Sequence, residues 1–225
     1  KGRVRENYKF IDNKSMLTEV NDVGEPIAEN KQAELIELVS TLSKSSNVVV
    51  ISGSLPRGIE SDYYTKLFNA IPEGKIKVAD CDGPRLLAAL QAGMDLVKPN
   101  KEELQLTLGQ EFRSRDELLK GCHALIDKGA ARVLLSLGKR GAVITDGSKN
   151  YFCHSINVAV NSTVGAGDGM VAAATMMLEQ GASLPEILRA GVAAGTATVT
   201  TFGQISFTKE KYDEIFANLT VEEIK

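Results

Sequence analysis

Residues 161–168 combine groups that could bind an anion with a carboxylate that could accept a proton. Gly165, Ala166, Gly167 and Asp168 directly precede an apolar stretch with helical periodicity. Amides at the start of a helix have no partners within the helix and lie at the positive end of its dipole, so they bind anions. A carboxylate beside them can take a proton from a hydroxyl while the amides stabilise charge on a transferred phosphoryl group. The pattern indicates phosphoryl transfer, although Asp168 alone would also complement the helix dipole.

Two earlier loops carry polar side chains directly after predicted strands. Residues 53–58 read Gly-Ser-Leu-Pro-Arg-Gly, which is typical of a tight turn between a strand and a helix. Residues 98–103 read Lys-Pro-Asn-Lys-Glu-Glu. The spacing of Asn100 and Glu103 favours a helix capping box when taken alone. The alternative is that these two side chains lie near a divalent metal or its waters, with Lys98 beside phosphates.

A fourth loop, residues 137–141, places Gly138 and Gly141 before an expected antiparallel strand. This spacing favours a hairpin, and it also leaves room for a nucleotide to approach the backbone. Other chemistries have less support. A P-loop is excluded because Gly-x-x-x-x-Gly-Lys-Ser/Thr is absent, and the absence of Gly-x-Ser-x-Gly argues against a serine hydrolase. His123 and His154 lack a second metal-type ligand nearby in the sequence, so we expect structural or surface roles for both.

The elements that position these loops alternate between strands and helices from residue 30 onward. Short apolar runs predict strands at 47–52, 76–79, 95–97 and 132–136, and antiparallel edge strands at 142–145 and 151–154. Helical spacing predicts helices at 31–43, 63–71, 85–92, 101–108, 115–128, 166–180, 184–200 and 209–217. The run at 47–52 is β-branched, as expected of a strand buried on both faces. Such alternation predicts an α/β fold with a mostly parallel sheet between two helical layers, and ligands bind beyond the carboxyl ends of its strands.

The first 25 residues have a different pattern. Residues 4–11 and 17–20 predict a β-hairpin. We therefore divide the chain into a projecting hairpin, residues 1–25, and one α/β domain, residues 26–225.

Composition limits the partners of this chain of 225 residues. The 26 basic and 29 acidic side chains leave a net charge of −3 without a basic tract, so nucleic acid is not an expected partner. No apolar run approaches the roughly 20 residues that span a bilayer, and the chain does not open on a secretory leader. Three widely spaced cysteines argue against a disulfide framework or zinc site and favour a reducing cytoplasm.

The order of the loops resembles that of the ribokinase-like sugar kinases of the PfkB type. The matching motifs are Gly-Ser-Leu-Pro at 53–56, Lys-Pro-Asn-x-x-Glu at 98–103, Ser-Leu-Gly-x-x-Gly at 136–141 and Ser-Thr-Val-Gly-Ala-Gly-Asp at 162–168. Within the family, they look most like the branch of 1-phosphofructokinases and tagatose-6-phosphate kinases. The resemblance covers this whole chain but only the last two thirds of a family member. It implies a ribokinase-like three-layer α/β/α fold with the hairpin as part of a β lid.

The resemblance also implies a role for each matching residue. Asp168 would be the catalytic base, and Gly165, Ala166 and Gly167 would supply the amides of an anion hole. The residues that would contact ATP are Lys98, Ser136, Gly138, Gly141, Thr163 and Gly195. Asn100 and Glu103 would hold Mg²⁺ through water. The residues that would bind the phosphorylated sugar are Arg5, Asn7, Lys9 and Ser54.

The implied activity is ATP-dependent phosphorylation of a ketohexose phosphate. Fructose 1-phosphate is the preferred acceptor, and tagatose 6-phosphate and fructose 6-phosphate are the alternatives. Members of the family often dimerise through the lid, so a homodimer is one arrangement that the resemblance allows. The rival hypothesis is a catalytically silent fragment that binds sugar phosphate.

Three features depart from the family pattern. Val4 replaces the usual Thr before Arg5, and Gly169 follows Asp168 where Ser or Thr is commoner, which would loosen the start of the helix. The front third, which binds the sugar in relatives, has no counterpart in these residues. We therefore expect an exposed sheet edge and little or no turnover from these 225 residues alone.

Overall fold

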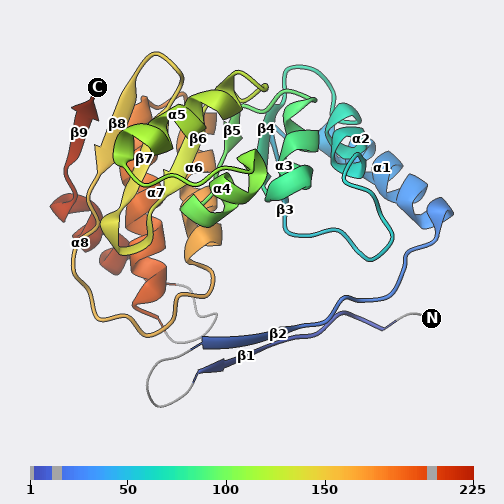
Figure 1. Cartoon of the computed structure of the whole chain (residues 1–225), viewed down its shortest axis with the longest axis horizontal. Helices are drawn as coiled ribbons and strands as arrows, with labels where there is room; N and C mark the ends of the chain where they lie inside the picture. The colour runs from blue at the N-terminus through green and yellow to red at the C-terminus, as the bar shows by residue number, and fades with distance from the viewer. Residues whose placement is uncertain (1–2, 12–16, 202–206) are drawn as a thin grey trace.

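The computed structural model describes residues 3–11, 17–201 and 207–225, and these form a seven-stranded sheet between two layers of helices (Figure 1). The strands are β3 Val48–Ser52, β4 Ile76–Asp80, β5 Leu96–Val97, β6 Val133–Ser136, β7 Ala142–Thr145, β8 Asn150–Cys153 and β9 Val221–Ile224. They lie side by side in chain order. β3 to β6 are parallel, whereas β7, β8 and β9 each pair antiparallel with the preceding strand.

Helices cover both faces of this sheet. The helices are α1 Glu29–Ser43, α2 Tyr63–Asn69, α3 Gly83–Leu90, α4 Lys101–Leu108, α5 Arg115–Ile126, α6 Ala166–Glu179, α7 Leu184–Val199 and α8 Lys209–Asn218. Helices α2 to α5 pack on one face and α6 to α8 on the other. The predicted α/β class and its three layers are therefore confirmed.

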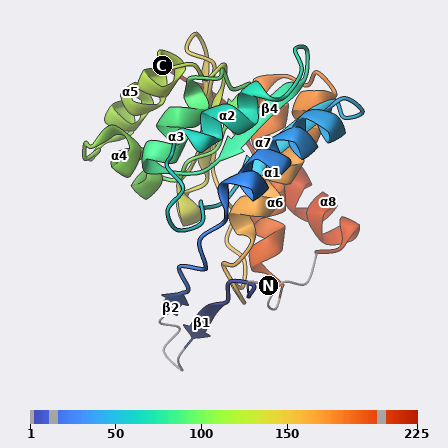
Figure 2. The same cartoon turned by 90° about the vertical axis from the view of Figure 1, so that its right-hand side faces the viewer.

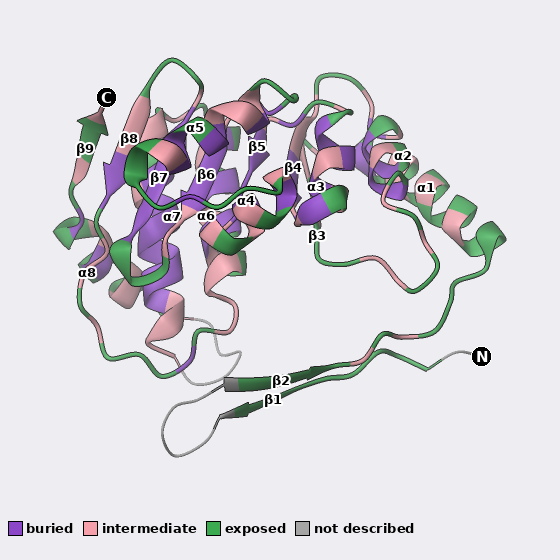
Figure 3. Cartoon of the chain, in the orientation of Figure 1, coloured by how far each residue is buried: buried purple, intermediate pink, exposed green. Residues whose placement is uncertain are grey.

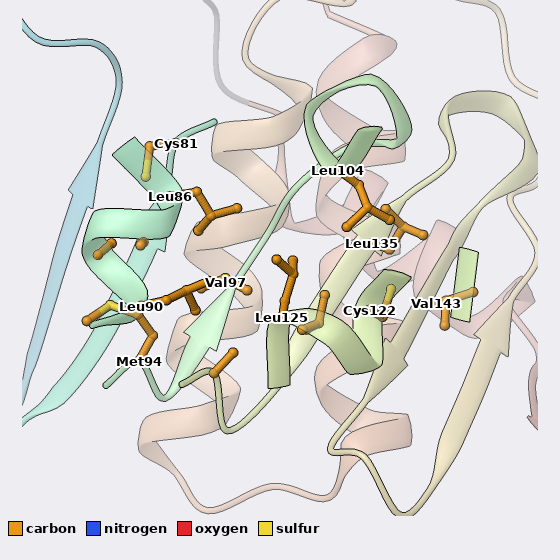
Figure 4. Close-up of a cluster of buried hydrophobic side chains, with 14 of the residues drawn as sticks. Cys81, Leu86, Leu90, Met94, Val97, Leu104, Cys122, Leu125, Leu135 and Val143 are labelled. Atoms are coloured by element: carbon orange, nitrogen blue, oxygen red, sulfur yellow. The ribbon is translucent and has the colours of Figure 1, made fainter. Parts of the chain in front are cut away.

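Two hydrophobic cores hold the layers together. The first lies between the sheet and α2–α5 and contains the fully buried Leu86, Leu125 and Leu135 (Figure 4). The second lies on the other face and contains the fully buried Leu134 and Leu188. Leu134 and Leu135 are neighbours in β6, and successive side chains of a strand point to opposite faces. An uninterrupted apolar strand therefore serves both cores.

The cysteines belong to these cores. Cys81, Cys122 and Cys153 are free and buried. Burial raises the pKa of the Cys122 thiol to about 12, so its reactive thiolate is scarce at neutral pH.

Two expectations about the ends of the sheet are wrong. Residues 142–145 and 151–154 are not edge strands, because β7 lies between β6 and β8 and β9 covers β8. The sequence gives no apolar alternation at β9, which carries Glu222 and Glu223 in its middle, as a short charged edge strand does. β3 is not buried on both faces either. Among the described strands it pairs only with β4, and Val50 is 43% exposed.

Helix α1, which precedes the edge strand β3, also has exposed apolar side chains. Leu35, Leu38 and Leu42 share one face of this helix and are all exposed. Val39, one turn after Leu35 and on the adjoining side of the helix, packs inward and contacts the first core. The apolar spacing therefore predicts the helix correctly, but only part of its apolar surface is covered in this chain.

The N-terminal hairpin stands apart from the α/β body (Figure 2). β1 Asn7–Ile11 pairs antiparallel with β2 Leu17–Asn21, and the connecting residues 12–16 lie outside the described part of the chain. Its strands are exposed along their described length (Figure 3). Tyr8, Phe10 and Val20 are all more than half exposed, and Tyr8 lies opposite Val20. The predicted hairpin is confirmed, and the division at residue 25 stays a prediction.

Candidate active site

The start of α6 has the geometry of an anion site. Gly165 is its N-cap and adopts a φ of +81°, a left-handed conformation that glycine reaches without steric cost. The Gly169 amide closes the first turn on the Gly165 carbonyl oxygen at 2.8 Å. Gly165 has no side chain with which to cap the helix. Among the described residues, the Ala166 amide donates to the Thr163 carbonyl oxygen at 3.4 Å, whereas the amides of Gly167 and Asp168 have no acceptor and remain available to a ligand. Asp168 lies in this first turn and is exposed, with its carboxylate open to a ligand.

Lys98 lies between this turn and the end of β4. Its side chain is only 5% exposed, and Nζ lies 3.2 Å from Oδ1 of Asp80. A Cβ placed on Gly167 would lie 3.4 Å from the same Nζ atom. The structure therefore brings Lys98 beside Gly167 and Asp168, as the predicted phosphate site requires.

Burial disfavours the charged forms of the carboxyl groups around Lys98. Burial raises the pKa of Asp80 although Lys98 lowers it, and the nearby charge of Asp168 raises it further. Burial also raises the pKa of Glu103, and the Asn100 amide and Lys98 oppose this shift. Each carboxylate is thus less well solvated than in water, so additional positive charge at this position would be favoured.

Asn100 and Glu103 form the predicted capping box at the start of α4. The Glu103 amide donates to Oδ1 of Asn100 at 2.8 Å, and the Asn100 amide donates to Oε2 of Glu103 at 2.8 Å. The structural interpretation of this motif is therefore correct, and a metal-binding role is an additional proposal. Oxygen ligands suit Mg²⁺, which usually keeps several waters and takes ligands from phosphates. Across residues 3–11, 17–201 and 207–225, no group of three His, Cys, Asp or Glu side chains is arranged to hold a metal unaided.

A cleft of about 450 Å³ opens beside the start of α6, and we call it the α6–α7 cleft. Five of the predicted nucleotide-binding residues line it: Ser136, Gly138, Gly141, Thr163 and Gly195. Ala166 and Gly167 line it as well, whereas Lys98 lies outside, behind Gly167. The four loops singled out in the sequence thus do not contribute equally, since this cleft takes its predicted residues from the last two and from α7.

The other wall of this cleft comes from residues that carry no recognisable motif. Ile156, Val158, Val160, Val192 and Val199 supply apolar surface, and Ser155, Asn157 and Thr196 supply polar groups. Residues 155–160 belong to the connection between β8 and α6, which has no periodicity that could have indicated a site. An apolar slot with a few polar groups is typical of a small-molecule site.

Three glycines that line the cleft are favoured for different structural reasons. A Cβ on Gly141 would lie 1.9 Å from the carbonyl oxygen of Cys153, so the neighbouring strand β8 requires glycine there. A Cβ on Gly138 would meet nothing within 4 Å, and its φ of +58° serves the turn itself. A Cβ on Gly195 would lie 3.2 Å from the Ala166 carbonyl oxygen, so this glycine lets α7 approach the start of α6.

A second cleft, of about 360 Å³, lies at the base of the hairpin, and we call it the hairpin cleft. The Arg5 guanidinium donates to the Ser54 hydroxyl at 2.7 Å, so the first strand-end loop meets the hairpin. Arg3 also lines this cleft and pairs with Asp22 at 2.6 Å. The other two predicted sugar-binding residues, Asn7 and Lys9, do not line it.

Sequence reasoning missed Asp80. It follows directly on the predicted strand 76–79, and the rule that ligands bind at the carboxyl ends of strands would have indicated it. The adjacent Asp82 and Arg85 form an ion pair, which adds charge to the same edge of the sheet.

Comparison with known proteins identifies the family. Residues 1–211 match the family model described as pfkB family carbohydrate kinase. This chain belongs to that family. It is 36% identical over 200 residues to the ATP-dependent 6-phosphofructokinase isozyme 2 of Escherichia coli K12, which covers 88% of this chain and 64% of the relative. It is 32% identical over 222 residues to the 1-phosphofructokinase of Borreliella burgdorferi, covering 98% of this chain and 71% of the relative.

The fold agrees with this assignment. The phosphofructokinase-2 of Escherichia coli, in a crystal structure with substrates and products, superposes with a TM-score of 0.86 at 34% identity. The match covers 96% of this chain and 71% of that one. This pfkB-family chain thus spans about two thirds of the length of its relatives. In the described residues, no helix has the length and apolar character needed to cross a membrane.

Proposed function

We propose that this chain carries the catalytic part of an ATP-dependent kinase that phosphorylates an alcohol group of a ketohexose phosphate. The observation that supports this most directly is the placement of Asp168. It is exposed in the first turn of α6, directly after Gly167, which lines the α6–α7 cleft and lies beside the buried Lys98. Among the described residues, a base, a cation and the unpaired amides of Gly167 and Asp168 thus lie close together.

Each group has a role that its chemistry supports. Asp168 takes the proton from the acceptor hydroxyl as this attacks the terminal phosphorus. The amides of Gly165, Ala166 and Gly167 stabilise the negative charge on the transferred group, and Lys98, whose Nζ lies beside Gly167, adds a positive charge.

ATP occupies the α6–α7 cleft in this proposal. Its base and ribose lie against the apolar wall, and its phosphates point toward the start of α6, where the amides are. Mg²⁺ would neutralise part of the phosphate charge, and Asn100 and Glu103 would hold its water ligands.

The hairpin cleft binds the phosphate that the acceptor already carries. A guanidinium suits a phosphate because it offers several donors in one plane. Arg5 is held toward the cleft by Ser54, and Arg3 adds a second guanidinium. Fructose 1-phosphate is the preferred acceptor because the motif at residues 162–168 most resembles that branch of the family. Tagatose 6-phosphate and fructose 6-phosphate are the alternatives. Asn7 and Lys9 lie farther along β1, where they would serve an acceptor that extends beneath the lid.

The exposed face of the hairpin supports a homodimer. Tyr8, Phe10 and Val20 gather on one side of the ribbon, and a second hairpin facing it would remove these side chains from water. The oligomeric state of a Phe10→Lys variant, measured by light scattering, tests this part of the proposal. A wild-type chain that is monomeric at micromolar concentration would contradict it.

The central test is turnover of the three ketose phosphates side by side, measured on the complete gene product that carries this chain, with the wild-type sequence and with Asp168→Asn. We expect the variant to lose about 10²–10⁴-fold in kcat because it cannot accept the proton. Its affinity for ATP should stay close to wild type. Asparagine keeps the size of the side chain, and Asp168→Asn protein must show the wild-type unfolding midpoint for the comparison to hold.

The rival hypothesis, a silent fragment that binds sugar phosphate, makes the opposite prediction. Such a fragment would bind ketose phosphate by calorimetry, transfer nothing, and be unaffected by Asp168→Asn. Turnover in the wild type that survives this substitution would contradict Asp168 as the base.

A further inference from the structure

The residue after Asp168 is Gly169, and it faces α7 at very short range. A Cβ placed on Gly169 would lie 2.6 Å from Oγ1 of Thr198 and 3.4 Å from the carbonyl oxygen of Ala194. Real Cβ atoms do not approach another atom as closely as 2.6 Å. Any side chain at position 169 therefore requires either Thr198 or the start of α6 to move.

Thr198 cannot move easily. Its hydroxyl donates to the Ala194 carbonyl oxygen at 2.8 Å, which fixes the side-chain rotamer. A threonine in a helix has few rotamers available because its Cβ is branched. Its methyl carbon, Cγ2, lies 3.7 Å from the position that a Cβ on Gly165 would occupy. One side chain of α7 thus touches both ends of the turn that carries Asp168.

The same end of α7 holds the preceding loop. The Asn161 amide donates to the Val199 carbonyl oxygen at 2.8 Å, and the Asn161 side chain donates to the Thr200 carbonyl oxygen at 2.7 Å. The loop and the first turn of α6 are therefore both attached to one short stretch of α7. The position of Asp168 relative to the α6–α7 cleft depends on these attachments.

We infer that Thr198 is a positioning residue for Asp168 and its anion site, and that Gly169 is required because Thr198 occupies the space of its side chain. The glycine would by itself loosen the helix, since glycine costs roughly 1 kcal/mol relative to alanine in a helix interior. Thr198 supplies the contact that restores a defined position. This inference rests on the proposed function for its kinetic consequence, but its structural consequence can be tested without turnover.

The experiment is a double-mutant cycle with Gly169→Ala and Thr198→Ala in the full chain. Gly169→Ala alone should displace the first turn and lower kcat, by up to about 10²-fold for a shift near 1 Å. The KM for ATP should change far less, because most of the cleft is untouched. The double variant should recover most of the lost kcat, since Thr198→Ala removes the atom that a Cβ at 169 would meet.

Two variants serve as matched controls. Thr198→Val keeps the branched shape, so Gly169→Ala combined with Thr198→Val should not recover. Gly191→Ala lies deeper in the same α6–α7 interface, where a Cβ would meet Cγ of Met170 at 3.2 Å. We expect it to lower the unfolding midpoint without a selective loss of kcat.

Amide hydrogen exchange over residues 164–170 gives a readout that does not need activity. Exchange there should accelerate in Gly169→Ala and return toward wild type in the double variant. If the complete gene product that carries this chain shows no turnover, the proposed function fails while the exchange data still decide this inference. Wild-type exchange and kcat in Gly169→Ala, or no recovery in the double variant, would overturn it.

Discussion

The α6–α7 cleft and the hairpin cleft are built in different ways. The first is walled by helices and strands that also form the second hydrophobic core, and its neighbouring cation, Lys98, is buried. The second is lined by Arg3, Arg5 and residues 23–27 at the base of the hairpin, with Ser54 and Pro56 from the loop after β3, and the side chain of Arg3 is 60% exposed. The stability of the fold therefore maintains the first cleft, whereas a few polar contacts maintain the second. Substitutions of the same kind should have unequal effects in the two places.

The largest effect is expected for Lys98→Met. This change leaves Asp80 buried without its partner, and breaking a buried ion pair costs about 3–5 kcal/mol. Chemical denaturation of the wild type and the variant measures the difference. The double variant Lys98→Met with Asp80→Asn should be more stable than Lys98→Met alone. A single variant as stable as wild type would show that the pair does not support the fold.

A smaller effect of another kind is expected for Arg5→Met. Hydrogen bonds to charged groups contribute about 1.5–3 kcal/mol, so the KM for the phosphorylated acceptor should rise roughly 10–100-fold. The unfolding midpoint should hardly change, because the hairpin lies outside the cores. Arg5→Lys keeps the charge but loses the planar donors and should give an intermediate KM. Equal KM values for all three proteins would remove Arg5 from the acceptor site.

The pH dependence of a Glu103→Gln variant tests how burial affects the carboxyl group of the α4 capping box. Burial raises the pKa of Glu103, so the native state binds this proton more tightly than the unfolded state. Wild-type stability relative to the variant should therefore fall as the pH rises from about 4.5 through the raised pKa, and stay level above it. A glutamine side chain can still accept the hydrogen bond of the capping box, so the two proteins differ mainly in the ionisable group. Thermal midpoints of both proteins from pH 3.5 to 8 give the result, and a difference that grows in favour of wild type with pH would refute the shift.

Sequence analysis predicted those parts of the site that are loops with recognisable motifs. The capping box of Asn100 and Glu103, the turn at Gly138 and the glycine start of α6 each depend on local chemistry, so they were predictable. Residues 155–160 were not, because a connection becomes a wall only through packing with α7. The exposure of Val50 was not predictable either, since an apolar run does not tell how many neighbours its strand has.

The smallest effect should follow from Lys9→Met, and it sharpens the contrast with Lys98. Lys9 pairs with Glu19 at 2.9 Å, a shorter distance than the 3.2 Å between Lys98 and Asp80. Its side chain is 39% exposed against 5% for Lys98, so water already solvates the charge and salt screens it. We therefore expect no measurable change in the unfolding midpoint of Lys9→Met in 0.15 M salt. A loss comparable to that of Lys98→Met would mean that distance, rather than burial, sets the strength of ion pairs in this fold.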